Sequence, residues 1–400
     1  MKYRSVPYLR FKKFKEKWQL EILGNLGSVA MNKRIFKEET SEVGEVPFYK
    51  IGTFGGEPDS FITREKFEEY KSKYPYPEIG DVLISASGSI GRTVEYQGEE
   101  AYFQDSNIVW LKHDKRLDNS FLKQFYSIVK WQGVEGTTIK RLYNKNILET
   151  PIPLPSIPEQ SAIGSLFRTL DELLASYKDN LANYQSLKAT MLSKMFPKAG
   201  QTVPEIRLDG FEGEWGKYCL GDIFEQVSNY IEPSVENELW SLTVEKGLTP
   251  KTDRYKRDFL VKKNDKFKKV DVNEFVYNPM NLTLGALDLN DNEVTISVSG
   301  YYVVMKNRDI EKFDNDFLKI LLKTTYAIYQ YKQFATGTLI EKQRVQFPTF
   351  SEIPFYLPPI AEQQAIGSYF SNLDNLITAH QEKIYQLETL KKKLLQDMFI

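Results

Sequence analysis

The chain contains the stretch LPSIPEQSAIGSLFRTLDELLASYKDNLANYQSLKATMLSKMF at Leu154–Phe196, and 203 residues later it contains LPPIAEQQAIGSYFSNLDNLITAHQEKIYQLETLKKKLLQDMF at Leu357–Phe399. The two stretches align without a gap and 18 of their 43 positions are identical, whereas about three identities would arise by chance from ordinary residue frequencies. A second match precedes them, because VPYLRFKKFKEKW at Val6–Trp18 resembles VPEIRLDGFEGEW at Val203–Trp215. The chain is therefore two copies of one unit whose middles have diverged.

Both repeated stretches predict a long amphipathic helix, because apolar residues recur at alternating spacings of four and three, the pattern of a heptad seam. The seam begins with Ile163, Phe167, Leu170 and Leu174 in the first helix and with Ile366, Phe370, Leu373 and Ile377 in the second. A helix with one apolar stripe needs a partner. We expect the two helices to pair within the chain, and pairing with helices of another protein is the alternative.

Polar residues mark the start of each helix and one position in each seam. Ser156 and Glu159 have the spacing of a capping box, and Pro359 replaces the serine in the second copy, so this cap is expected to be missing there. Lys188 and Lys391 occupy matching seam positions. A polar seam residue can fix the register, but we expect each lysine to pack its stem and to extend its ammonium into water.

The regions between the matched ends predict a mixed α+β fold. Residues 79–96, 101–112 and 294–306 are expected to form strands, and residues 120–131 and 316–331 are each expected to form a short amphipathic helix. We expect a first globular domain at 1–153, a first long helix at 154–200, a second globular domain at 201–356 and a second long helix at 357–400.

Composition narrows the possible functions. The chain has 53 basic and 54 acidic residues and a net charge of −1, which argues against a globally basic nucleic-acid coat but allows local basic patches. One cysteine, Cys219, and two histidines, His113 and His380, leave little for a disulfide or a zinc site. The start does not resemble a signal peptide, and no stretch approaches 18 apolar residues, so a cytoplasmic setting without membrane contact is expected.

Two near-motifs for catalysis are weak. Asn278-Pro-Met280 follows a strand-like segment but lacks the second proline and the aromatic residue of amino-methylating DNA enzymes. Asp59, Glu69 and Lys71 fit the spacing of a metal-dependent nuclease site. They lie in a segment so rich in glutamate and lysine that an exposed charged helix is the preferred interpretation. We therefore expect no catalytic residue, no metal site and no bound cofactor on this chain.

Several basic or glycine-rich segments are candidates for DNA contact, and each has a plainer interpretation as an ordinary turn or a solvated surface. The loop at 88–92 lets the backbone approach a phosphate, and the basic run at 251–269 interleaves aromatic residues. The candidate residues are Gly88, Ser89, Gly91, Arg92, Lys140, Arg141, Arg254, Lys256, Arg257, Lys262, Lys263 and Arg344.

The arrangement resembles the specificity subunits of type I restriction–modification systems. The motifs that carry the resemblance are LPSIPEQ at Leu154 and LPPIAEQ at Leu357, FRTLD at Phe167 and FSNLD at Phe370, and GDVLIS at Gly80. The resemblance implies two target-recognition domains that each read one half of a split DNA sequence. It also implies that the two helices form an antiparallel coiled coil, which relates the domains by a pseudo-two-fold axis and fixes the gap.

The same resemblance implies partners. Methyltransferase subunits, two per chain, are expected to dock on the repeated helical regions and to bring S-adenosylmethionine, and a restriction subunit that uses Mg²⁺ and ATP is expected to join indirectly. The residues implied in this docking or in the coiled coil are the seam residues named above together with Glu159, Gln160, Glu362 and Gln363.

Three hypotheses follow for the function. The preferred one is a non-catalytic subunit that binds double-stranded DNA in a sequence-specific manner. The first alternative is a scaffold that binds restriction–modification subunits without reading DNA. The second is an enzyme that uses Asp59, Glu69 and Lys71.

Overall fold

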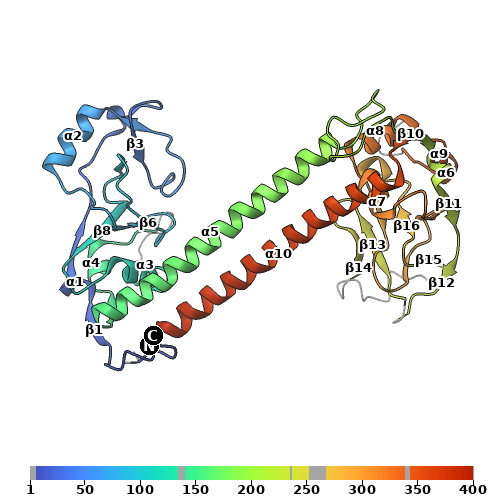
Figure 1. The fold of residues 1–400 in the computed structure, drawn as a ribbon. Helices are drawn as coiled ribbons and strands as arrows, with labels where there is room; N and C mark the ends of the chain where they lie inside the picture. Colours follow the sequence, from blue (N-terminus) through green and yellow to red (C-terminus); the bar gives the residue numbers. More distant parts are fainter. Residues whose placement is uncertain (1–5, 134–139, 235–236, 252–266, 338–342, 400) are drawn as a thin grey trace. The chain divides into compact units, whose positions relative to one another are not determined.

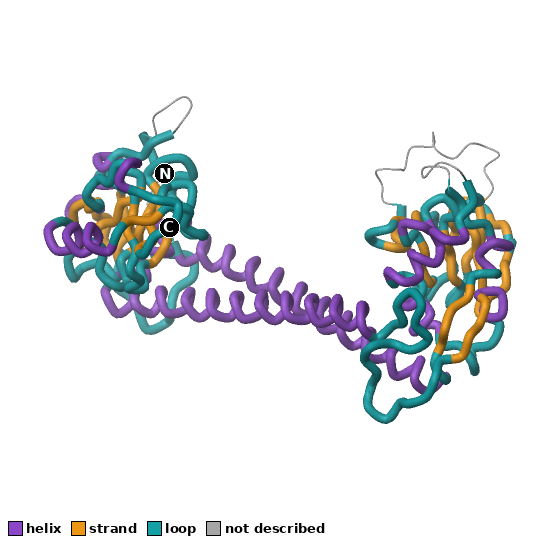
Figure 2. Tube along the Cα trace, turned by 90° about the horizontal axis from the view of Figure 1, so that it is seen from above, coloured by secondary structure: helices purple, strands orange, loops and turns teal. Residues whose placement is uncertain are grey.

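The computed structural model describes residues 6–133, 140–234, 237–251, 267–337 and 343–399. The chain has a mixed α+β fold and divides into two compact units. Unit 1 comprises Met1–Lys178 and Glu382–Ile400, and unit 2 comprises Asp179–Gln381. Each long helix therefore contributes one part to each unit, and in both units strands and short helices accompany these parts (Figures 1 and 2). The four-segment division predicted from the sequence stays a prediction.

The described strands of unit 1 form three small sheets. Their strand orders are β2-β8-β5-β6, β4-β3-β7 and β1-β9. The strands are β1 (Gln19–Ile22), β2 (Gly27–Ala30), β3 (Val46–Tyr49), β4 (Phe61–Ile62), β5 (Val82–Ser85), β6 (Thr93–Glu95), β7 (Tyr102–Phe103), β8 (Ile108–His113) and β9 (Pro151–Leu154). The helices are α1 (Leu23–Leu26), η1 (Lys37–Glu39), α2 (Arg64–Lys73), α3 (Asn119–Ile128), α4 (Asn144–Leu148) and the first part of α5 (Ile157–Lys194).

Unit 2 repeats part of this plan. Its sheets have the orders β11-β19-β16-β17, β12-β15-β18, β13-β14 and β10-β20. The strands are β10 (Gly216–Cys219), β11 (Phe224–Val227), β12 (Tyr230–Ile231), β13 (Trp240–Thr243), β14 (Gly247–Pro250), β15 (Phe267–Val270), β16 (Phe275–Tyr277), β17 (Leu287–Leu289), β18 (Ile296–Ser299), β19 (Val303–Asn307) and β20 (Pro354–Leu357). The helices are α6 (Leu220–Ile223), η3 (Leu282–Leu284), α7 (Asn315–Leu321), α8 (Thr325–Phe334), α9 (Phe347–Ser351), the end of α5 and the first part of α10 (Ile360–Met398).

The two units share a four-stranded sheet that is not apparent from sequence identity. The order β2-β8-β5-β6 in unit 1 corresponds to β11-β19-β16-β17 in unit 2, and the pair β1-β9 corresponds to β10-β20. The three-stranded sheets of the two units differ. In unit 1, β3 pairs with β7 in parallel, whereas in unit 2 the strands β12, β15 and β18 are antiparallel. The middles of the two copies are therefore partly the same fold with different residues.

Within each unit the two long helices run antiparallel. In unit 1, Lys178 pairs with Glu388 at 2.7 Å and Asp171 with Lys391 further along α10, so residue numbers rise on one helix as they fall on the other. In unit 2 the rings of Tyr184 and His380 lie 5.1 Å apart, and those of Phe196 and Phe370 lie 6.0 Å apart. Pairing within the chain is confirmed for these segments.

The ends of the helices enter the cores of the units. Phe399, at the end of the second copy, stacks on Phe121 of unit 1 with ring centroids 5.1 Å apart. The ring centroid of Phe196, at the end of the first copy, lies 5.7 Å from that of Phe317 in unit 2. The core of each unit therefore contains an aromatic residue from the helix that follows the other copy's globular region.

Two local predictions were wrong. Residues 316–331 form two helices instead of one, because the Thr324 side chain caps α8 by accepting a hydrogen bond from the Ala327 N–H at 3.1 Å. The expected capping box at Ser156 is replaced by another contact of Glu159, described below. The Ser156 and Pro359 carbonyls accept equivalent backbone hydrogen bonds from the first turns of α5 and α10. The proline therefore does not change how the second helix begins.

Among the residues that the structure describes, no helix is long and apolar enough to cross a membrane.

Candidate nucleic-acid interface

A buried ion pair joins the start of α5 to the N-terminal segment of unit 1. The Arg10 Nε and Nη2 donate to the two carboxylate oxygens of Glu159 at 2.6 and 2.7 Å, and the Glu159 side chain is 1% exposed. This is the bidentate geometry, with two parallel hydrogen bonds, in which arginine binds a carboxylate most strongly. The hydrogen bond to Glu159 raises the pKa of Arg10 above its ordinary value. The repeat places the same pair in unit 2, where Arg207 donates to Glu362 at 2.8 and 2.6 Å.

The glutamine next to each glutamate completes the joint. The Gln160 side chain accepts from the Asp118 N–H at 2.8 Å and donates to the carbonyls of Arg116 and Pro155 at 3.0 and 2.9 Å. Gln363 makes the corresponding contacts in unit 2, with the Asp314 N–H and the carbonyls of Lys312 and Pro358.

The sequence placed these Glu-Gln pairs among residues for partner docking or the coiled coil. The structure places them in the joint between helix and globular region, where all four side chains are buried against their own chain. In this structure they are therefore not a surface for a partner.

Of the eight seam residues named from the sequence, seven are buried as the heptads predict. Ile163, Phe167, Leu170 and Leu174 lie in the core of unit 1, and Ile366, Phe370 and Leu373 lie in the core of unit 2, whereas Ile377 is partly exposed. At Gly164 helix α5 lies close to α3, since a Cβ there would lie 1.8 Å from the Ser120 Oγ and 2.5 Å from its Cβ. Gly367 occupies the matching place in α10, close to Asp314 and Asp316.

The seam lysines do not simply extend into water. Lys391 pairs with Asp171 in unit 1, and Lys188 pairs with Asp374 in unit 2. The prediction of solvated ammonium groups was therefore wrong. Both aspartates belong to the repeated F-x-x-L-D motif, so the sequence contained all four residues of these two pairs at matching positions.

In unit 1 the structure brings two separate candidate segments together. The turn between β5 and β6 contains Gly88 and Gly91 at φ +65° and +87°, which favours glycine. Ser87 forms a β-bridge with Arg141 across the turn, and the Leu142 N–H donates to the Ala86 carbonyl at 2.8 Å.

The side chains at this turn differ in accessibility and in bonding. Gly88, Ser89, Lys140 and Arg141 are exposed. The Arg92 side chain is partly engaged, because its Nη1 donates to the Phe54 carbonyl at 2.8 Å.

Unit 2 presents an equivalent turn between β16 and β17. The Asn278 N–H donates to the Ala286 carbonyl at 3.0 Å, as the Ser85 N–H does to Arg92 at 2.8 Å. The Val345 N–H donates to the Pro279 carbonyl at 3.0 Å, so the exposed Arg344 stands where Arg141 stands in unit 1. The sequence interpretation set Asn278-Pro-Met280 aside and missed it as the counterpart of the turn at 86–91. The signal it could have used is the glycine that ends both turns, Gly91 and Gly285.

The basic run is only partly described. Arg254, Lys256, Arg257, Lys262 and Lys263 lie outside the described residues. Of the lysines that follow them, Lys268 is buried and donates to the Tyr302 carbonyl at 2.6 Å, and Lys269 pairs with Asp271 at 2.8 Å.

The residues of the nuclease-like spacing each contact a different neighbour. Asp59 pairs with Lys50 at 2.8 Å, Glu69 pairs with Lys73 at 3.0 Å, and the Lys71 ammonium lies 5.1 Å from the Phe67 ring. Glu69 and Lys71 belong to α2, the charged helix expected from the sequence. In the described part of the chain, no group of three or more His, Cys, Asp or Glu side chains is placed to hold a metal ion.

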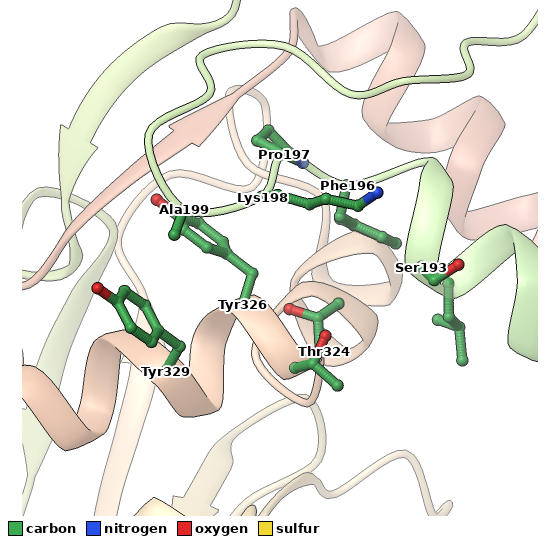
Figure 3. A pocket seen from close by; sticks show the side chains of 10 residues that line it. Ser193, Phe196, Pro197, Lys198, Ala199, Thr324, Tyr326 and Tyr329 are labelled. Carbon is green, nitrogen blue, oxygen red and sulfur yellow. The ribbon is translucent and has the colours of Figure 1, made fainter.

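A small pocket in unit 2 lies where the segment after α5 meets the start of α8 (Figure 3). Phe196, Pro197 and Lys198 line one side, and Thr324, Tyr326 and Tyr329 line the other. Its charged residue, Lys198, pairs with Glu205 at 3.1 Å. The pocket therefore offers no unpaired charge to a ligand.

Comparison with known proteins places the chain in a family. The family model described as the type I restriction modification DNA specificity domain matches residues 15–183 and again residues 212–389. The chain belongs to the type I restriction–modification DNA specificity family. The two matches cover one copy of the repeat each, as the resemblance in the sequence implied.

Individual relatives agree with this assignment. A putative type I restriction enzyme specificity subunit from Haemophilus influenzae is 52% identical over 160 residues, which are 40% of this chain and 42% of that protein. The type I restriction enzyme MjaVIII specificity subunit from Methanocaldococcus jannaschii is 22% identical over 82% of this chain and 80% of its own length. A solved structure, the S subunit of a type I restriction–modification system from M. genitalium, covers 99% of both chains with a TM-score of 0.62 at 17% identity, which shows the same fold.

Proposed function

We propose that this chain is the non-catalytic, DNA-reading subunit of a type I restriction–modification complex. Each unit reads one half of a bipartite site in double-stranded DNA, and the paired helices set the spacing between the halves. The observation that carries the proposal is the pair of turns at 86–91 and 279–285, which stand on the same hydrogen-bonded frame but carry different residues. One frame with two sets of exposed side chains is what two different half-sites require.

The repeated ion pairs support the proposed role of the helices. Lys391 with Asp171 and Lys188 with Asp374 fix the same register in each unit, and the buried Glu-Gln joints fix each helix start to its globular region. A rigid joint is needed if a helix is to transmit a defined spacing, because a mobile joint would let each unit bind at variable separations.

The proposal assigns the chemistry to other chains. Methyltransferase subunits, two per complex, dock on the helical regions and supply S-adenosylmethionine, and a restriction subunit that uses Mg²⁺ and ATP joins through them. The chain itself holds none of these cofactors and catalyses no step. Its location in this proposal is the cytoplasm, where DNA and these partners are present.

The test is to express the chain with its methyltransferase partners in a host that lacks DNA methylation, and to sequence the methylated bases. The proposal expects one split motif with a fixed gap and no methylation when the chain is expressed alone. The scaffold alternative expects a stable complex with no sequence preference. Methylation or cleavage of DNA by the purified chain alone would refute the non-catalytic role.

A further inference from the structure

The two equivalent turns differ in the chemistry of their exposed residues. Unit 1 exposes Gly88 and Ser89, which are small and polar. Unit 2 exposes two large apolar side chains at the corresponding turn, Met280 at 51% and Leu284 at 57%. Single exposed apolar residues are common on protein surfaces, but these two lie four residues apart on one short turn, so both are available to one partner.

The residue beside each turn is the same in both units. Arg141 and Arg344 are exposed, and each immediately precedes the residue whose N–H donates to the turn carbonyl, Leu142 and Val345. No carboxylate among the described residues forms an ion pair with either arginine. An exposed guanidinium is well suited to a phosphate oxygen, and such contacts position a protein on DNA without carrying sequence information.

We propose that these turns are the specificity-determining elements of the two half-sites. In unit 1 the Gly88 backbone and the Ser89 hydroxyl meet base edges, and in unit 2 the Met280 and Leu284 side chains meet the methyl group of a thymine. Arg141 and Arg344 bind the adjacent phosphates. This inference rests on the proposed function and assigns residues to it.

The chemistry of base edges supports this division. The thymine C5-methyl is the apolar group that the major groove presents, and apolar side chains recognise it by contact. A glycine turn allows the backbone to come close to a base, and a hydroxyl can donate to or accept from several bases. A phosphate contact is the same for every sequence, which explains why the arginine is common to both units whereas the turn residues are not.

The experiment uses the assembled complex with its methyltransferase subunits. One variant carries Met280→Ala with Leu284→Ala, a second carries Ser89→Ala, and a third carries Arg344→Ala. Ile310→Ala is the matched control, since Ile310 is an apolar residue of unit 2 that is 66% exposed away from the turn. Methylated bases are sequenced for each variant, and binding to duplexes is measured by fluorescence anisotropy over a range of salt concentrations.

The expected results separate the roles. The Met280/Leu284 variant loses discrimination at a thymine position of one half-site by roughly 5- to 150-fold, the equivalent of a lost base contact, and keeps the other half. Ser89→Ala relaxes only that other half. Arg344→Ala keeps the whole motif but weakens binding to all duplexes and lowers the salt slope by about one. Ile310→Ala behaves like the unchanged chain.

The outcomes distinguish this inference from the proposed function. A split motif that stays unchanged in the Met280/Leu284 and Ser89 variants overturns the inference and leaves the proposed function standing. A wild-type complex without any sequence preference overturns both. The half-site that each variant leaves intact reports on folding, because a misfolded chain would lose both halves together.

Discussion

The buried ion pair between Arg10 and Glu159 gives a prediction whose size can be worked out. Replacing Arg10 with methionine keeps most of the side-chain volume but leaves the Glu159 carboxylate, which is 1% exposed, without its partner. Removing one partner of a buried pair costs about 3–5 kcal/mol, because the remaining charge is neither solvated nor compensated. With a denaturant dependence of about 2 kcal/mol per molar urea, the unfolding midpoint of unit 1 should fall by roughly 2 M.

The assay can report on unit 1 alone. Amide hydrogen exchange at residues 157–170, measured by mass spectrometry across a urea series, follows the start of α5. Residues 360–373, at the start of α10, carry the equivalent joint in unit 2 and should be unchanged in the same sample. Arg64→Met is a second control, because Arg64 and its partner Glu100 are 46% and 54% exposed, so its loss should leave the midpoint unchanged.

A double variant tests the reasoning itself. Replacing Arg10 and Glu159 together with methionine removes both charges, and such apolar replacements of buried pairs are often neutral or stabilising. The double variant should therefore be more stable than Arg10→Met alone. Two results would refute this reasoning: a double variant as unstable as the single one, or a loss of less than about 1 kcal/mol in the free energy of unfolding for Arg10→Met. In either case a buried, unpaired Glu159 carboxylate would not be the cause of instability.

Three further predictions concern the helices and the joint. Gly164→Ala should destabilise unit 1 by about 1–3 kcal/mol in thermal or urea unfolding, because the new Cβ meets Ser120. The control is Gly52→Ala, where no atom lies within 4 Å of the new Cβ. Equal losses of stability in the two variants would contradict the close approach at Gly164. Asp171→Lys and Lys391→Asp should each lower the melting temperature, because each places two like charges where an ion pair stood. The two substitutions together should restore the melting temperature. Additive decreases in the melting temperature would show that the two residues do not interact. Burial opposes the ionisation of Asp118, but hydrogen bonds from Ser120, Ser161 and Phe121 outweigh it and lower the pKa of this carboxyl. The ionised carboxylate therefore stabilises unit 1 above the ordinary pKa near 3.8, and this stabilisation is lost as the pH falls through the lowered pKa. Asp118→Asn should flatten the loss of unit 1 stability at acid pH, and an unchanged pH dependence would refute this role.

The long helices were predictable because their periodicity and their repetition are local signals. The heptad pattern needs only neighbouring residues, and the gapless alignment of Leu154–Phe196 with Leu357–Phe399 repeats it. The role of the Glu-Gln pairs was not predictable in the same way, because Arg10 lies 149 residues from Glu159 in the sequence. The repeat did hold a clue, since Arg10 and Arg207 recur at matching positions together with the two glutamates.

The correspondence of the two turns was hidden for a different physical reason. It is made by backbone hydrogen bonds, such as those to the Ala86 and Pro279 carbonyls, and these bonds do not require particular side chains. Apart from the closing glycines Gly91 and Gly285, residues 86–91 and 279–285 could therefore change while the backbone frame stayed the same. Arg141 and Arg344 were named as candidates from the sequence, but the turns beside which they lie were not paired with each other.

The position of Phe399 has a consequence for how the chain folds during synthesis. The core of unit 1 includes Phe399, which contacts Trp18, Phe121 and Phe167. Everything else in this unit up to Lys178 leaves the ribosome 221 residues earlier, since 399 − 178 = 221. At about 5–20 residues per second, the unfinished core waits about 10–45 s with its aromatic surface uncovered. During this interval the core of unit 1 stays incomplete, whereas unit 2 already has Phe196 and can close once Ile366, Phe370 and Leu373 of α10 have been added.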